Sequence, residues 1–387
     1  MVEEHKSRLL LGATIAVLLA LSYGAGFGVY ALRERTQATR TLGAPEMALF
    51  WEAWERVDEH FYGEVPSAQA RTYGAIRGAL GLLDAHTRLV EPVPRSLEKD
   101  ELRGAHGGIG ARLTTNDAGE VTLEPYPGSP AERAGITVGD VLTAVDGRRL
   151  SAGTPADDIA AMIRGDVGTE VEITVRKPSG ATRTAVVKRE LIEIPSVTWR
   201  METELTGYVR VDRFTERTAG ELASALDGLD SEGARGLILD LRGNRGGLVD
   251  TAVTVAERFL RKGDVVMRQR GREAERTFRA DRKGDLSTPL AVLVDGDTAS
   301  AAEIVAGALR DNDRARLFGE TTFGKGSVQE IYDLADGSSL HVTSAIWLTP
   351  NGQPIAGEGL TPDTEVAADT EGEDTPLRRA VEYLESE

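Results

Sequence analysis

Short apolar runs alternate with segments of helical spacing through the second half of the chain. The apolar runs cover residues 207–214, 235–242 and 290–294, and the helical segments that follow them cover 218–229, 250–261 and 299–310. Strands that alternate with helices predict an α/β sheet with helices on its faces. The run 235–242 is bounded by glycines, and its continuous apolar character predicts a buried parallel strand.

A second pattern, of short strands and turns rich in glycine and proline, fills residues 101–190. The predicted strands cover 121–124, 138–146, 168–176 and 182–188, a turn with a short helix covers 127–135, and a longer helix covers 154–163. Short strands of this kind, separated by turn residues, predict a small and mostly β module in front of the α/β region.

Two helices are predicted near the N-terminus, over residues 46–60 and 68–83. Phe50, Trp51 and Trp54 fall on one face of the first helix, and we expect that face to be buried. Simple packing accounts for both helices, so neither is given a functional role.

Residues 9–32 form a run of 24 positions without a charged side chain. About 20 apolar residues suffice for a helix that spans a bilayer. A cleaved signal peptide is the alternative, but the run is long for one and its end lacks a clear cleavage site. We favour an uncleaved membrane anchor, whose orientation the lysines and arginines on both sides of the run do not fix.

The composition describes a globular chain and excludes several classes of function. Of 387 residues, 41% are hydrophobic and 28% are charged. The net charge of −17 argues against nucleic-acid binding, which needs a basic face to offset phosphate. The chain has no cysteine, so disulfides, thiolate nucleophiles and cysteine zinc sites are all excluded.

A serine follows the apolar run 290–294, at the predicted junction of a strand and a helix. The hydroxyl of Ser300 would lie beside the free N–H groups of the helix start, which favour developing negative charge. A serine hydroxyl needs a base to become a nucleophile. None of the five histidines stands in a recognisable triad setting, whereas Lys325 lies between glycines and can act as a base if burial lowers its pKa. A Ser300–Lys325 dyad is therefore our hypothesis.

Two plainer interpretations compete with the dyad. Ser300 and Glu303 fit a capping box, and for these four residues alone capping is the more common role. Residues 319–325 match most of a nucleotide-binding Walker A loop. The next residue, however, is Gly326 instead of the serine or threonine that holds magnesium, and the stretch that follows alternates like a strand. Nucleotide binding is accordingly the weaker interpretation.

The segment 289–330 resembles the catalytic segment of the carboxy-terminal processing (tail-specific) proteases. That family carries a serine at a Ser-Ala-Ser-like helix start, a lysine in Phe-Gly-Lys-Gly and a glutamine four residues later. The resemblance implies that Ser300 is the nucleophile and Lys325 the general base, and that Gln329 orients the lysine amine by a hydrogen bond.

Three further positions of this segment can be compared with the same family. Glu303, three residues after the serine, and Asp311, after the helix, match family positions and are expected to support the site. Ala302 departs from the common Ser-Ala-Ser-Ala-Ser-Glu pattern beside the nucleophile, which is a small change.

The loop after one predicted strand resembles another element of this family. Residues 240–247 read Asp-Leu-Arg-Gly-Asn-Arg-Gly-Gly, similar to the family's Asp-Leu-Arg-Asn-Asn-Pro-Gly-Gly. The resemblance implies an oxyanion hole made by the N–H of Ala301 together with the N–H of either Gly246 or Gly247. Arg245 replaces the usual proline, which would stiffen the loop. A Gly-rich turn that serves only tight packing is the alternative.

The β module resembles a PDZ domain over essentially its whole length, through the order of its elements and the motif Gly-Ser-Pro-Ala-Glu-Arg-Ala-Gly at 128–135. A PDZ domain binds an extended peptide as an added strand and holds the terminal carboxylate with backbone N–H groups of a Gly-rich loop. The resemblance implies that Gly108, Ile109 and Gly110 form this loop, with Ile109 as an apolar floor. A Gly-rich turn without a ligand is the alternative.

Together the resemblances imply an α/β fold with a crotonase/ClpP-like catalytic core, an inserted and mostly β PDZ domain, an N-terminal helical region and one N-terminal transmembrane helix. The expected boundaries are 1–40 for the anchor or signal region, 41–98 for the helical region, 99–192 for the PDZ domain and 193–387 for the serine-lysine peptidase core with its C-terminal segment.

The function implied is that of a serine endopeptidase that cleaves proteins near or from their C-terminus through an acyl-enzyme, with the substrate tail recognised by the PDZ domain. The expected partners are unfolded or partly unfolded proteins and the membrane, and a regulatory adaptor or a second copy of the chain is left open. No nucleic acid, metal or cofactor is expected. The catalytic part would be extracytoplasmic, in the periplasm. The alternative is a non-catalytic, membrane-anchored PDZ adaptor on a peptidase-like scaffold.

Overall fold

The computed structural model describes residues 44–116, 118–151, 153–367 and 373–386. The chain divides into two compact units, one ending at Gly74 and the other beginning at Ala75. The predicted membrane anchor at 9–32 lies outside the described residues. Within the described ranges, no helix is both long and apolar enough to cross a membrane.

The first unit contains the helix α2 (Ala44–His60) and the start of α3 (Ala68–Leu80). Arg71 of α3 lies over the ring of Trp54, with its Cζ atom 5.3 Å from the ring centroid, and its Nη1 atom lies 3.2 Å from a carboxylate oxygen of Asp58. The expected burial of the aromatic face is wrong for Trp51, which is 61% exposed. Two helices offer too little area to cover all the aromatic rings of one of them.

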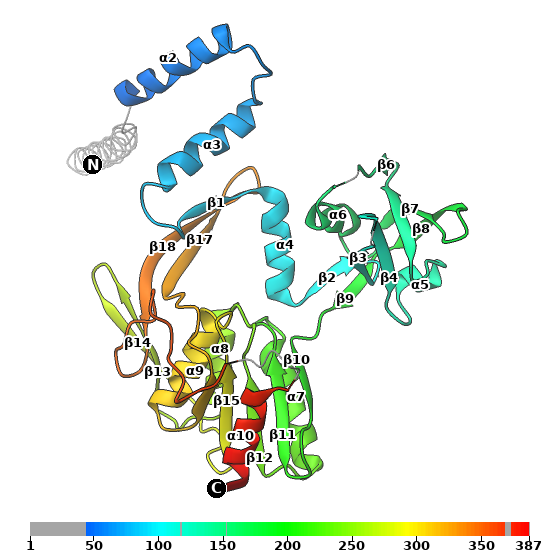
Figure 1. The fold of residues 1–387 in the computed structure, drawn as a ribbon. Coiled ribbons are helices and arrows are strands. Elements are labelled where there is room, and N and C mark those ends of the chain that lie inside the picture. Colours follow the sequence, from blue (N-terminus) through cyan, green and yellow to red (C-terminus); the bar gives the residue numbers. More distant parts are fainter. Residues whose placement is uncertain (1–43, 117, 152, 368–372, 387) are drawn as a thin grey trace, which may run out of the picture. The chain divides into compact units, whose positions relative to one another are not determined.

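The second unit contains a six-stranded sheet (Figure 1), and Ser300 follows one of its strands. Its strands, in spatial order, are β10 (Val197–Met201), β11 (Thr206–Val211), β12 (Gly236–Asp240), β15 (Leu290–Val294), β16 (Arg316–Gly319) and β19 (Thr364–Glu365). All neighbours pair in parallel except the edge strand β10, which pairs antiparallel with β11. The predicted α/β sheet is therefore confirmed.

Successive residues of the central strands pack against different helices. Val209, Leu239 and Val292 share a core with the helices α7 (Thr218–Ser231), α8 (Val249–Glu257) and α9 (Ala301–Asp311). Their neighbours Ile238 and Leu293 pack instead with the C-terminal helix α10 (Thr375–Ser386). Both faces of the sheet are covered, which explains why these strands are apolar without interruption. The helix α8 ends four residues earlier than predicted.

A second sheet of the core consists of β1 (Arg88–Val90), β13 (Val265–Gly271), β14 (Glu275–Arg279), β17 (Ser327–Asp333) and β18 (Ser339–Leu348). A strand was expected after Gly326, where β17 lies, whereas the hairpin of β13 and β14 was not predicted. The helix α4 (Pro92–Arg103) was not predicted either, although Pro92 stands in its first turn and Gly104 caps its end with φ of 70°.

The mostly β module forms its own sheet and its own hydrophobic core. The strands follow the order β3 (Ala111–Thr115), β4 (Val121–Pro125), β5 (Asp140–Val145), β7 (Glu170–Arg176) and β8 (Thr182–Lys188), and β6 (Arg148–Arg149) pairs with β5. The remaining elements are α5 (Pro130–Arg133), α6 (Ala156–Ile163) and the pair formed by β2 (Ala105–Gly108) and β9 (Glu190–Glu193). In this order β3 is an edge strand, with β4 as its one neighbour.

Candidate functional site

Ser300 lies between β15 and α9 in a backbone conformation that residues other than glycine rarely adopt. Its φ is 57° and its ψ is −117°. The N–H of Ala299, the residue before Ser300, donates to the carbonyl oxygen of Asn244 at 2.9 Å. This hydrogen bond holds the serine turn against the loop that follows β12. A strained backbone of this kind persists where the surroundings determine it, and it is typical of turns that present a nucleophile.

Glu303 is fully buried, and its carboxylate accepts four hydrogen bonds. Its donors are the N–H of Ser300 at 2.7 Å, the hydroxyl of Thr322 at 2.6 Å, the N–H of Gly324 at 2.8 Å and the N–H of Lys325 at 3.0 Å. The bond to Ser300 is the glutamate half of the predicted capping box. The other three tie the start of α9 to the loop that carries the lysine.

Lys325 is half-buried just before β17. Burial lowers the pKa of its amine, and the nearby guanidinium groups of Arg88 and Arg213 lower it further, whereas the carboxylate of Glu98 acts in the opposite direction. Within the described part of the chain, the amine makes no hydrogen bond and no ion pair. A lysine with a lowered pKa and no partner is suited to act as a base.

Gln329 lies in β17, but it does not contact the lysine amine in this structure. Its side-chain Nε2 donates to the backbone carbonyl of His86. The predicted hydrogen bond from Gln329 to Lys325 is therefore not made, because the amide group is already used by the segment that precedes β1.

The glycines of the predicted oxyanion loop pack closely against their surroundings. A Cβ atom on Gly246 would lie 2.9 Å from the Cβ of Ser300 and 3.1 Å from the backbone nitrogen of Ala301. A Cβ atom on Gly247 would lie 2.1 Å from the carbonyl oxygen of Phe214. Both glycines also have positive φ, of 101° and 139°. Only glycine can bring this loop against the serine turn.

Asn244 organises this loop and was missed as a site residue by the sequence analysis. It is fully buried, its Nδ2 donates to the carbonyl of Val211 at 2.8 Å, and its Oδ1 accepts the N–H of Gly246 at 2.9 Å. Arg245, at the family's proline position, forms an ion pair with Asp297 at 3.0 Å. The N–H of Gly246 is thus engaged, whereas that of Gly247 donates to no described residue.

Asp311 lies at the opposite end of α9 from Ser300. It pairs with Arg310 at 2.9 Å and accepts the backbone N–H of Asn351 at 3.0 Å. Ten residues of α-helix are about 15 Å long. Asp311 therefore stabilises the far end of the helix and does not contact the hydroxyl of Ser300.

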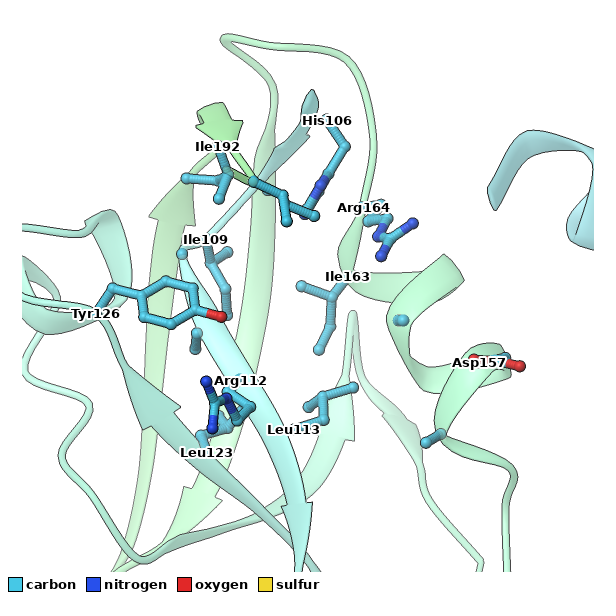
Figure 2. A pocket seen from close by; sticks show the side chains of 16 residues that line it. His106, Ile109, Arg112, Leu113, Leu123, Tyr126, Asp157, Ile163, Arg164 and Ile192 are labelled. Atoms are coloured by element: carbon cyan, nitrogen blue, oxygen red, sulfur yellow. The ribbon is translucent and has the colours of Figure 1, made fainter. Parts of the chain in front are cut away.

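A groove of about 270 Å³ lies in the mostly β module, lined by residues of β3, α6 and the predicted Gly-rich loop (Figure 2). The carbonyls of Ile109 and Gly110 accept the N–H groups of Ala131 and Tyr126 at 2.8 and 2.9 Å, which fixes the loop. The N–H groups of Ile109 and Gly110 donate to no described residue. They can therefore hold a carboxylate, as the resemblance to a PDZ domain implies.

His106 and Arg164 line one end of the same groove. Burial lowers the pKa of His106 to about 4, and the positive charge of Arg164 contributes to this. The Nδ1 atom of His106 is buried without a hydrogen-bond partner among the described residues. Its ring is therefore neutral near pH 7.

Comparisons with known proteins agree with this architecture. Residues 205–366 match peptidase family S41, and residues 121–177 match the PDZ domain family. The chain is 36% identical over 330 residues to a carboxy-terminal-processing protease of Bartonella bacilliformis, which covers 83% of this chain and 75% of that protein. It is 34% identical over 316 residues to the carboxy-terminal processing protease CtpA of Bacillus subtilis, covering 81% and 67%.

Solved structures of proteases also align with this chain. The structure of a photosystem II D1 C-terminal processing protease aligns with a TM-score of 0.50 and 32% sequence identity, over 86% of this chain and 97% of that chain. A structure described as a putative S41 protease from Bacteroides fragilis aligns with a TM-score of 0.51 at 16% identity, which shows the fold alone.

Proposed function

Because the chain belongs to the carboxy-terminal processing proteases of peptidase family S41, we propose that Ser300 is its nucleophile and Lys325 its general base. The observation that carries this proposal is the buried carboxylate of Glu303, which accepts the backbone N–H groups of both residues. The strained turn at Ser300 and the lowered pKa of Lys325 support the same assignment.

In the proposed reaction, the neutral amine of Lys325 accepts the hydroxyl proton of Ser300 while the serine oxygen attacks a peptide carbonyl carbon. The tetrahedral intermediate collapses when the lysine ammonium returns the proton to the leaving amine, which leaves an acyl-enzyme on Ser300. Water then attacks the ester with Lys325 again as the base, and the lysine ammonium returns this proton to the oxygen of Ser300 as the ester bond breaks. The carboxylic acid product leaves and gives its remaining proton to the solvent.

We assign the oxyanion hole to the N–H of Ala301 and an N–H of the glycine loop. Gly246 lies against Ser300, and its N–H becomes available when it leaves the Oδ1 of Asn244. The N–H of Gly247 is available without such a change. One donor of this kind contributes roughly 3 kcal/mol to lowering the barrier.

The proposed substrate is an unfolded or partly unfolded protein whose C-terminal tail docks in the PDZ groove. The uncharged run at 9–32 supports a membrane anchor, and the resemblance to the family implies that the catalytic part lies outside the cytoplasm. Carbonate extraction and protease protection of the full chain in intact cells test both points. Release by carbonate would contradict the anchor, and protection of the catalytic part inside the cytoplasm would contradict its location.

The dyad is tested with the full chain in detergent micelles, as wild type, Ser300→Ala and Lys325→Ala. Each form is incubated with an unstructured protein that ends in apolar residues, and the products are identified by mass spectrometry. We expect cleavage by the wild type alone, with the Ser300→Ala form still binding the substrate tail. Equal cleavage by all three forms would show that the dyad is wrong. Tail binding without cleavage by any form would favour the adaptor alternative.

A further inference from the structure

The free edge of β3 faces the groove of the PDZ domain. This strand pairs with β4 on one side, and the groove between β3 and α6 lies on its other side (Figure 2). The inference that follows rests on the proposed docking of a substrate tail in this groove. A tail that adds to β3 with its carboxylate at the Gly-rich loop runs antiparallel to the strand, and its side chains then alternate between the groove and the opposite face of the sheet.

The final residue of such a tail points into the groove. There it meets the apolar side chains of Ile109, Leu123 and Ile163. Ala160, on the helix side, is small and leaves room for a branched or aromatic side chain. This end of the groove accordingly selects an apolar last residue, which is a general property of grooves of this kind.

The penultimate residue points to the other face, where this chain has an exposed arginine. Arg112 is the second residue of β3 and lies directly opposite Glu124 of β4. The next cross-strand pair on that face, Thr114 and Thr122, is joined by a hydrogen bond of 2.7 Å between the hydroxyls. Figure 2 shows Arg112 beside Tyr126, away from the helix that carries Asp157.

Arg112 has no ion pair within the described part of the chain, although Glu124 is its cross-strand neighbour. An added strand would place the penultimate side chain of the tail on the free side of Arg112, so that the arginine lies between that side chain and Glu124. Opposite charges at directly opposed positions of a sheet attract each other, and like charges repel.

We infer that Arg112 makes the groove select tails with an acidic penultimate residue and reject tails with a basic one. The charge complementarity is local, since Asp157, the acidic residue that lines the groove, lies on the helix side, away from Arg112 (Figure 2). The occupant is thus a protein C-terminus with a free carboxylate, an apolar last residue and Asp or Glu before it.

Binding is measured by fluorescence anisotropy with the full-length Ser300→Ala chain in detergent at low salt. The probes are labelled ten-residue peptides that end in a free carboxylate and differ only in the penultimate residue, which is Glu, Gln or Lys. We expect the Glu peptide to bind about two- to fivefold more tightly than the Gln peptide, and the Lys peptide to bind less tightly, in line with exposed ion pairs. Arg112→Gln should abolish the difference, and Arg112→Glu should reverse it.

Two matched controls keep the test specific. Arg148→Gln removes an exposed arginine elsewhere in the domain, and Asp157→Asn changes the helix side of the groove, so neither should alter the preference at the penultimate position. If the protein with Arg112 intact binds the three peptides with equal affinity, the inference is overturned while tail docking stands. If a C-terminally amidated peptide binds as tightly as the free acid, or if no peptide binds, tail docking itself is overturned together with the inference.

Discussion

The carboxylate of Glu303 accepts the backbone N–H of Lys325 at 3.0 Å, across 22 positions of the sequence. The same oxygen, Oε2, accepts the N–H of Ser300 at 2.7 Å. The turn that presents the nucleophile and the loop that presents the base therefore share one buried anchor. Movement of either segment would cost at least one charge-assisted hydrogen bond.

We predict that Glu303→Gln lowers both activity and stability. The amide oxygen of glutamine can accept some of the four hydrogen bonds, but its NH₂ group would face N–H donors and leave them unpaired. Hydrogen bonds to buried charged groups contribute about 1.5–3 kcal/mol each, so we expect about 2–4 kcal/mol lower stability. We also expect kcat to fall by about 100-fold in the folded enzyme, because the two catalytic segments lose their common anchor.

Chemical denaturation and steady-state kinetics on the same preparations check this. Glu232→Gln, at an exposed position after α7, is the matched control and should behave like the wild type. A Glu303→Gln enzyme with unchanged kcat would mean that the anchor is not needed for catalysis.

The strands and helices around the site were largely predictable from the sequence, whereas its long-range contacts were not. The apolar runs before Ser300 and before the glycine loop are buried on both faces, so their periodicity and length were clear. The bond from Gln329 to His86 joins residues 243 positions apart, and local spacing carries no information about it. The roles of the Asn244 side chain depend likewise on the neighbouring strand β11.

Other elements were missed for local reasons. The helix α4 is rich in charged residues and has few apolar ones, so its first-turn proline and terminal Gly104 were the signals that could have revealed it. The aromatic face of α2 was expected to be buried because apolar residues usually are, yet Trp51 is exposed within its unit. The spacing of apolar residues identifies the apolar face of a helix, but it does not show which other segment packs against that face.

The pH dependence of kcat/KM should report the environment of Lys325. Activity rises with pH as the amine loses its proton, and the midpoint lies below the usual lysine value of 10.5 because burial and Arg88 lower the pKa. Arg88→Gln removes a positive charge, so the lysine keeps its proton more firmly and the midpoint moves to higher pH. Glu98→Gln removes a negative charge and should move it to lower pH.

These opposite shifts are measured as pH–rate profiles at low salt, where exposed charges are least screened. Arg148→Gln, in the PDZ domain, should leave the profile unchanged. Profiles that do not move, or that move in the same direction for both variants, would contradict the assignment of Lys325 as the base.

The PDZ domain should lose stability at acid pH through His106. Its pKa is lowered to about 4 in the folded state, chiefly by burial, from an ordinary value of 6.5. The unfolded state therefore binds a proton that the folded state does not bind between these two values. The loss of stability caused by His106 is absent above about pH 6.5. It increases as the pH falls from 6.5 towards 4 and does not increase further below pH 4.

Scanning calorimetry of the full chain between pH 4 and 7.5 checks this prediction. His106→Gln should reduce the acid-induced fall in the melting temperature of the PDZ transition. His60→Gln, at an exposed histidine of the first unit, is the matched control and should leave that transition unchanged. The same fall in His106→Gln as in the wild type would show that other groups cause it.

Gln329→Ala separates two roles of this side chain. In the structure its amide donates to the carbonyl of His86, whereas the family resemblance implies that it orients the amine of Lys325. If the side chain moves to the lysine during turnover, its removal should lower kcat by about tenfold with little change in KM, because the interaction is made in the transition state. Glu330→Ala, at the exposed neighbouring position, controls for disturbance of β17. An unchanged kcat would leave Gln329 as a structural tie between β17 and the segment before β1.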